Sequence, residues 1–144
     1  MKKILISEII KICKKLDSLY KSKSFANDLY EAYIWAFAYD ICKKIDKSTT
    51  IYGNSSGLVF RCAPGYIYSN KYSYFEYKSP KSGNLYCGEI GVRFQDVNSI
   101  LHEYDFSIIS KNDRDSCIAA KADPSSRSCK IHVEAKFFSN AISL

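Results

Sequence analysis

Residues 102–109 read HEYDFSII and residues 132–138 read HVEAKFF. Both stretches are rich in the aromatic and β-branched residues that favour strands, yet each carries acids in its middle. Alternate residues of a strand share a face. In the second stretch this rule collects one wholly apolar face, made of Ile131, Val133, Ala135 and Phe137. It leaves Glu134 and Lys136 side by side on the other face.

The same rule places Glu103, Asp105 and Ser107 on one face of the first stretch. If the two strands are neighbours, Asp105 stands beside Glu134, and two adjacent carboxylates repel unless a cation lies between them. Mg²⁺ is the natural occupant, because it takes oxygen ligands from one or two carboxylates together with waters and phosphate oxygens. Lys136 could then stabilise charge on a phosphate or orient the attacking water.

The rest of the chain predicts helices followed by strands. Apolar residues at three- and four-residue spacing predict an N-terminal amphipathic helix within residues 1–22, with its lysines outward. Residues 25–45 predict a second, more buried helix, because apolar residues cover nearly its whole circumference. The strands are expected at residues 57–64, 72–78, 85–94, 101–110 and 129–138. Residues 111–128 predict a long loop with a helical turn at 115–121.

These elements predict one α+β or mixed α/β domain with helices packed on a sheet. The chain has 144 residues, of which 47% are hydrophobic and 25% charged, as in an ordinary globular domain. It lacks a long apolar run, so we expect no membrane span and a cytoplasmic location. The six cysteines form no CxxC pair, which favours reduced thiols over a zinc site. The net charge of +6 mildly favours an anionic partner such as nucleic acid.

Asp105, followed later by Glu134-Ala135-Lys136, resembles the D...(D/E)xK signature of the restriction-endonuclease-like, or PD-(D/E)xK, phosphodiesterase superfamily. The resemblance covers roughly residue 25 to the end of the chain and includes a helix before the strands. It implies a restriction-endonuclease-like core, residues 25–144, with helices packed on a central mixed β-sheet.

The resemblance also implies roles for individual residues. Asp105 and Glu134 would hold Mg²⁺, for which Mn²⁺ could substitute, and the carbonyl of Ala135 would be a further ligand. Lys136 would act on the water and the scissile phosphate. Members often add a glutamate from the first core helix, and Glu31 is the expected residue in this chain.

Glu89, on the preceding predicted strand, is the alternative to Glu31 as the additional acid. Two features depart from the family pattern. Tyr104 stands where the family often has proline, and the chain stops where a basic helix and a last strand would follow the ExK strand. We therefore expect the 144 residues to be part of a longer polypeptide that supplies these elements.

The implied function is a metal-dependent nuclease that hydrolyses phosphodiester bonds in DNA, with RNA less favoured, in defence against foreign DNA or in repair. Arg61, Lys71 and Lys78 lie among tyrosines and would suit contacts to phosphates and bases. The alternative is a non-catalytic nucleic-acid- or protein-binding module that retains a nuclease-like fold. A third reading makes the acids structural, with Glu134 and Lys136 as an exposed ion pair.

Two other kinds of site have weaker support in the sequence. His102 falls on the strand face opposite Asp105, so a zinc site shared between them would need a β-bulge. Cys87 and Cys117 have no base within sequence reach, which gives no support to a cysteine nucleophile. Ordinary packing within a sheet explains the tyrosines around Arg61, Lys71 and Lys78 as well as stacking on nucleic-acid bases does.

Overall fold

The computed structural model describes residues 26–53, 58–61, 64–69 and 71–134. The predicted N-terminal helix, Ala135, Lys136 and the end of the fifth predicted strand lie outside these residues. The described elements follow one another as α2 (Ala26–Ile45), β1 (Thr50–Tyr52), β2 (Tyr74–Lys78), β3 (Leu85–Gln95), β4 (Leu101–Ser110), α3 (Lys111–Ala120), the 3₁₀ helix η1 (Ser126–Ser128) and β5 (Cys129–Val133).

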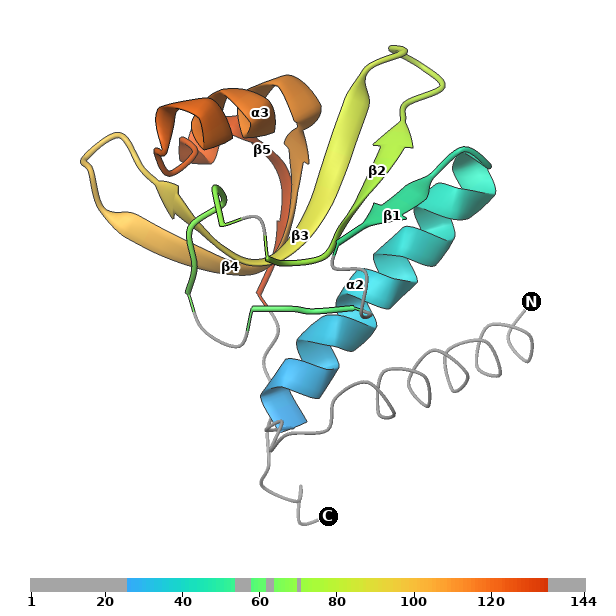
Figure 1. The fold of residues 1–144 in the computed structure, drawn as a ribbon, viewed down its shortest axis with the longest axis horizontal. Helices are drawn as coiled ribbons and strands as arrows, with labels where there is room; N and C mark the ends of the chain where they lie inside the picture. The colour runs from blue at the N-terminus through green and yellow to red at the C-terminus, as the bar shows by residue number, and fades with distance from the viewer. Residues whose placement is uncertain (1–25, 54–57, 62–63, 70, 135–144) are drawn as a thin grey trace, which may run out of the picture.

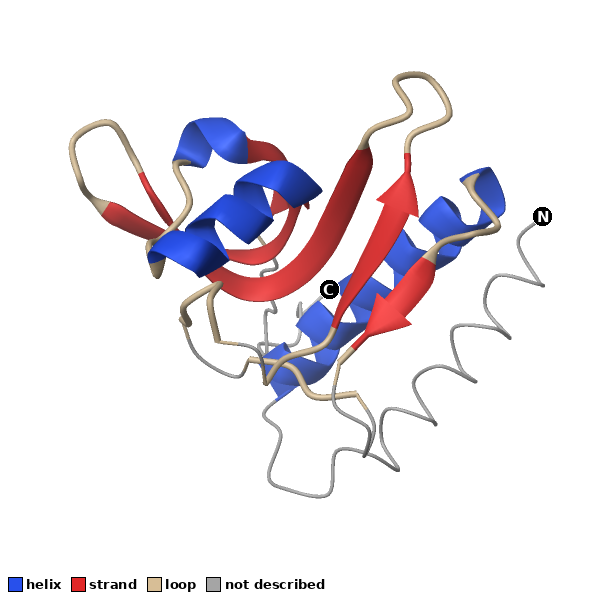
Figure 2. Cartoon of the chain, turned by 45° about the horizontal axis from the view of Figure 1, so that its top comes forward, coloured by secondary structure: helices blue, strands red, loops and turns tan. Residues whose placement is uncertain are grey.

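The five described strands form one sheet in the order β1-β2-β3-β4-β5, so every strand lies beside its neighbour in sequence. All four pairings between these strands are antiparallel. The α+β class is therefore correct, whereas the predicted mixed sheet is wrong for the described part of the chain. Helix α2 covers one face of the sheet and α3 the other (Figures 1 and 2).

Helix α2 is held to the sheet by an aromatic cluster. Trp35 is buried, its indole NH donates to the carbonyl oxygen of Gly88 at 3.0 Å, and its ring contacts Phe60 and Phe75 edge-on. We call this the α2-side core, and its buried members are Ala32, Trp35, Ala36, Cys42, Phe60, Phe75, Ile90, Phe106 and Ile108. A smaller α3-side core contains Ile67, Cys87, Val92, Phe94 and Ile109.

Strand β3 changes the face of its side chains at Gly91. Ile90 belongs to the α2-side core, yet Val92, two residues later, belongs to the α3-side core. Gly91 has φ 61°, a backbone conformation that glycine adopts at little cost. Strand β4 changes in the same place, because Phe106 lies in the α2-side core whereas Tyr104 packs on the α3-side core. Strict alternation therefore does not hold across this part of the two strands.

Helix α3 replaces most of the predicted loop 111–128. The predicted single turn is instead ten residues long, beginning at Lys111. Ser110 caps it: its hydroxyl accepts from the backbone N–H of Asp113 at 3.1 Å and donates to the Asp113 carboxylate at 2.7 Å. The helix ends at Ala120 and is capped by Lys121, whose φ of 50° is left-handed. The cap, Ser followed by Asp three residues later, is a helix-start signal that the sequence does contain.

Two strand predictions also change. The expected strand at 57–64 does not form in the residues of this range that the structure describes. Its Val59 carbonyl oxygen accepts a hydrogen bond from the backbone N–H of Ser73, just before β2, at 2.7 Å. A three-residue strand, β1, was not anticipated. The other expected strands are confirmed as β2, β3, β4 and the described part of β5. Neither described helix has the length and apolar character needed to cross a bilayer.

Gly88 provides a test of the contact between the sheet and α2. A Cβ added there would collide with the Phe75 ring, which is fully buried in the α2-side core. Gly88→Ala should lower the free energy of unfolding by about 1–3 kcal/mol, the usual cost of overpacking a core. Urea unfolding measures this, with Ser82→Ala in the exposed β2–β3 turn as the control, for which a change within about 0.5 kcal/mol is expected. An unchanged midpoint for Gly88→Ala would contradict the packing described.

Candidate functional site

The two acids of the predicted metal pair lie on neighbouring strands. Asp105 is half-buried within β4, and Glu134 is exposed and directly follows β5. Phe106 pairs with Val133. The next step of the same antiparallel register sets Asp105 opposite Glu134. In such a register the two acids are cross-strand neighbours, a position in which Cβ atoms stand about 4.5–5.5 Å apart.

Glu103 is a third acid of this region, which the sequence analysis did not assign to the site. Partial burial raises the pKa of its carboxyl, and the negative charges of Asp105 and Glu134 raise it further. Glu103 therefore lies in the field of both acids. The sequence signal for it is its position two residues before Asp105 on the same strand. Ser107, expected beside them, is instead fully buried opposite Glu89.

The remaining predicted site residues are Glu31, Ala135 and Lys136, and the structure does not bring Glu31 together with Asp105 and Glu134. Glu31 is half-buried on α2, on the sheet face opposite to α3. Ala135 and Lys136 follow Glu134 directly and lie outside the described residues. Within the part of the chain that the structure describes, no group of three or more His, Cys, Asp or Glu residues is arranged to hold a metal ion.

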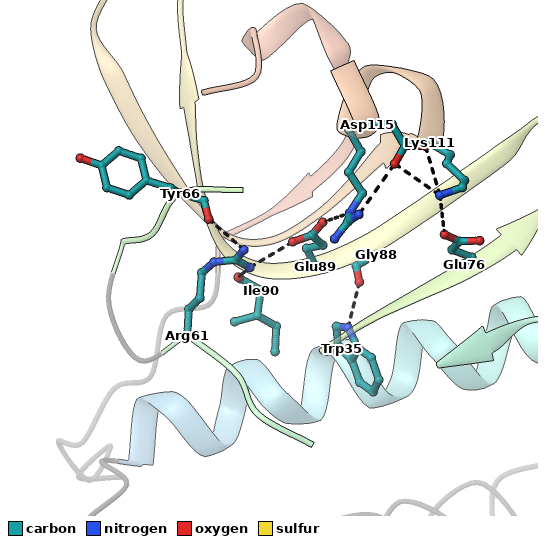
Figure 3. A network of polar contacts seen from close by, with 10 residues as sticks. Trp35, Arg61, Tyr66, Glu76, Gly88, Glu89, Ile90, Lys111 and Asp115 are labelled. Carbon is teal, nitrogen blue, oxygen red and sulfur yellow. Dashed lines mark hydrogen bonds and ion pairs between the residues drawn. The ribbon is translucent and has the colours of Figure 1, made fainter. Parts of the chain in front are cut away.

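A buried ionic cluster occupies the opposite side of β3 from α2 (Figure 3). Glu89 is only 1% exposed, and each of its carboxylate oxygens meets an arginine. Arg61 Nη1 lies 3.1 Å from Oε2, and Arg114 Nε lies 2.5 Å from Oε1. A buried carboxylate is costly unless it is paired and hydrogen-bonded, and here both requirements are met.

The two arginines come from different segments and have further partners. Arg61 also donates to the backbone oxygens of Ile90 at 3.0 Å and Tyr66 at 3.1 Å. Arg114 lies on α3, with its guanidinium 3.6 Å from the centre of the Tyr74 ring. Because both arginines form ion pairs with the Glu89 carboxylate, the segment that contains Arg61 and helix α3 are both held to β3.

A second ionic contact holds the start of α3. Lys111 Nζ lies 2.9 Å from a carboxylate oxygen of Glu76 on β2 and 3.2 Å from Asp115. The hydrogen bond with Glu76 is the largest cause of the raised pKa of Lys111. Helix α3 is therefore anchored to β2 and β3 by charge, in addition to its apolar contacts.

These contacts correct two assignments. Arg61 was expected at a nucleic-acid surface, but it is 3% exposed and bound to Glu89. Glu89 was the alternative additional acid, but both of its oxygens are occupied by arginines, so it has no free oxygen for a metal. Lys71 and Lys78 are exposed and stay available to a partner.

The histidines and cysteines have other roles. His102 lies 3.5 Å from Asp96 in the β3–β4 turn, and His132 stacks on Tyr104 at 4.4 Å between ring centres. Burial raises the pKa of Cys42 to about 11 and that of Cys87 to about 12. Both thiols are therefore protonated at neutral pH and poor nucleophiles.

Comparison of the sequence with family models and with curated proteins, and of the structure with solved structures, gave no match. The assignment of chemistry to this chain therefore rests on the residues themselves.

Removing the charge of Glu89 tests the buried cluster. Glu89→Gln leaves two buried guanidinium groups without their anion, and we expect it to lower the free energy of unfolding by about 3–5 kcal/mol. The matched control is Lys44→Ala, which removes an exposed i,i+4 pair with Asp40 and should cost less than about 1 kcal/mol. Urea titration of both variants gives the comparison. Equal effects in the two variants would contradict a structural role for the cluster.

The raised pKa of Glu103 predicts a pH-dependent stability. The folded chain binds the Glu103 proton more tightly than the unfolded chain, so ionisation of this carboxyl disfavours folding at neutral pH. Glu103→Gln should therefore be more stable than wild type at pH 7, and the difference should vanish as the pH falls below the carboxyl's unfolded pKa, about 4.3. Unfolding midpoints across this pH range test it. A variant less stable than wild type at pH 7 would contradict the prediction.

Proposed function

We propose that this chain is a metal-dependent nuclease in which Asp105 and Glu134 bind Mg²⁺. One observation carries the proposal: of the two acids of the motif, 29 residues apart in the sequence, Asp105 lies in β4 and Glu134 directly follows its antiparallel neighbour β5. Continuing the register by one residue beyond the pair Phe106–Val133 would set the two acids opposite each other. An acid pair of this kind is what the D...(D/E)xK resemblance requires.

The donor set fits a hard divalent ion. Asp105 and Glu134 offer carboxylate oxygens, and Mg²⁺ binds through one or two carboxylates while keeping waters and taking phosphate oxygens. Partial burial raises the pKa of the Glu103 carboxyl, and the negative charges of Asp105 and Glu134 raise it further, which places Glu103 in the field of both acids. The Ala135 carbonyl could add a ligand, Mn²⁺ could replace Mg²⁺, and Glu31 stays the expected additional acid.

The proposed chemical roles follow from the side chains. A bound metal ion would supply an activated water and would screen the phosphate charge. Asp105 and Glu134 fix its position through their carboxylates. Lys136, beside Glu134 in sequence, is assigned to the scissile phosphate and the water, where its ammonium would favour the charge that develops during cleavage.

The restriction-endonuclease-like core is part of the same proposal. Strands β3, β4 and β5, preceded by α2, supply the helix-then-strands order that the resemblance implies. In the sequence, helix α3 comes between β4 and β5, where the resemblance implied a hairpin-like span. In the proposed core α3 is an addition to that span.

Nucleic acid, DNA in preference to RNA, is the proposed partner, and the cytoplasm the proposed location. The positive excess of the chain is unevenly distributed: residues 26–134 hold equal numbers of basic and acidic residues. Residues 1–25 hold seven lysines and two acids, and Lys136 supplies the remaining excess charge. Lysines attract the phosphate backbone without regard to base sequence, so affinity for DNA should depend mainly on the seven lysines of residues 1–25.

The second candidate is a binding module that retains the fold without catalysis. The observation in its favour is that the acids among the described residues do not form a three-ligand metal group. The two candidates differ in their need for metal, because a binding module requires no Mg²⁺ at Asp105 and Glu134.

Cleavage assays with site variants test the nuclease. Asp105→Ala and Glu134→Ala should abolish Mg²⁺-dependent cleavage of DNA because the ion is no longer held. Lys136→Ala should bind Mg²⁺ but cleave about 100- to 1,000-fold more slowly, the usual loss for one group that stabilises transition-state charge. Affinity for DNA should survive in all three variants, since it depends on lysines elsewhere. The assay compares Mg²⁺, Mn²⁺ and EDTA, with calorimetric titration of Mg²⁺ into each protein.

The matched control is Asp115→Ala, which removes an exposed acid on α3 away from the acid pair and should cleave like wild type. Cleavage that persists in EDTA, or an Asp105→Ala protein as active as wild type, would refute the mechanism. DNA binding without cleavage under any metal by the full-length polypeptide would favour the binding module.

A further inference from the structure

Glu134, one of the two proposed metal ligands, lies just beyond the paired part of β5. Strand β5 is at the edge of the described sheet, and its pairing with β4 is irregular between Ile108 and Ile109. Val133 is the last residue of β5 that has a partner in β4, so Glu134 follows one step later. The ends of edge strands are among the parts of a fold that open most readily. The contacts of the last residues of β5 therefore decide how well Glu134 is held near Asp105.

Two side chains hold this strand end, one on each face of the sheet. Val133 packs against the α2-side core. On the other face, the exposed ring of His132 stacks on Tyr104, with 4.4 Å between the ring centres and 15° between the ring planes. Tyr104 in turn packs on the α3-side core, and its ring centre lies 4.9 Å from that of the buried Phe94. Three rings thus connect β3, β4 and the end of β5.

The stack of His132 on Tyr104 crosses from β4 to β5 beside the acid pair. Tyr104 directly precedes Asp105, and His132 lies two residues before Glu134. Continuing the strand by one residue puts Glu134 on the face of His132, since alternate strand residues share a face. A ring that is fixed at His132 limits rotation of the strand end, and with it the direction of the Glu134 carboxylate.

We infer that His132 is a positioning residue, whose stack on Tyr104 holds the end of β5 so that Glu134 stays close to Asp105. The inference rests on the proposed Mg²⁺ site at these two acids. In this role His132 contacts neither the ion nor a phosphate. A pair of stacked rings changes a local equilibrium by about 2- to 10-fold beyond the effect of its buried area. We therefore expect weaker binding of Mg²⁺ without the stack, and not the loss of the site.

Calorimetric titration of Mg²⁺ into the full chain tests the inference. His132→Ala removes the ring and should weaken Mg²⁺ binding about 2- to 10-fold. His132→Phe keeps a ring that can stack on Tyr104 and should bind Mg²⁺ like wild type. The matched control is His102→Ala, which removes the other histidine of the chain, an exposed side chain beside Asp96, and should also bind like wild type.

Hydrogen exchange without metal measures the same stack independently of any activity. The β5 amides of His132→Ala should exchange about 2- to 10-fold faster than those of wild type, and His132→Phe should restore the wild-type rate. The amides of β2 and β3 should exchange alike in all the variants, because His132 is exposed and belongs to neither core. In cleavage assays, excess Mg²⁺ should bring His132→Ala to the wild-type rate, since both acids are intact.

The possible failures are distinguishable. Equal Mg²⁺ affinity or equal β5 exchange in His132→Ala and wild type would overturn the positioning role and leave the metal site standing. So would a His132→Phe protein as impaired as His132→Ala. A His132→Phe protein that binds Mg²⁺ normally but cleaves slowly would give His132 a direct part in the chemistry, which also overturns the inference. A wild-type protein that binds no Mg²⁺ would refute the proposed function, and this inference with it.

The supporting result is specific. Weaker Mg²⁺ binding and faster β5 exchange in His132→Ala, both reversed in His132→Phe and both absent in His102→Ala, establish the positioning role.

Discussion

The placement of the acid-bearing strands depends on the contact between one buried carboxylate and two arginines. Glu89 sits in the middle of the sheet, where an unpaired charge would be unstable. Arg61 approaches it from the segment before β2, and Arg114 from α3. The two arginines and one carboxylate carry a net positive charge. It is offset by the hydrogen bond from Arg61 to the Ile90 carbonyl oxygen and by the cation–π contact of Arg114 with the Tyr74 ring. One strand residue thus fixes two segments that are far apart in the sequence.

This anchoring determines what can happen at β5. Helix α3 and the 3₁₀ helix η1 are the only regular elements between β4 and β5, so the position of α3 limits where the chain can return. Helix α3 packs on β3 and β4, with Arg114 bound to Glu89 on β3 and Lys111 bound to Glu76 on β2, and the chain comes back along β4. Contacts on the α3 face of the sheet therefore hold the helix that connects β4 to β5.

The sequence predicted the elements that depend on local pattern and missed those that depend on distant partners. Runs of aromatic and β-branched residues identified β3 and β4, and apolar residues around nearly the whole circumference identified α2. The role of Arg61 could not be predicted locally, because its partner, Glu89, lies 28 residues later and among apolar neighbours. The pairing of β4 with β5 could be expected, because strands that follow one another in the sequence usually lie side by side. Alternation failed at Gly91, where a left-handed backbone changes the face of the following residues.

Charge distribution bears on the proposed metal site. The described part of the chain has no positive excess of its own, and Glu103 lies in the field of Asp105 and Glu134. A polyanion would be repelled by these carboxylates unless a cation screened them, while the seven lysines of residues 1–25 would attract it.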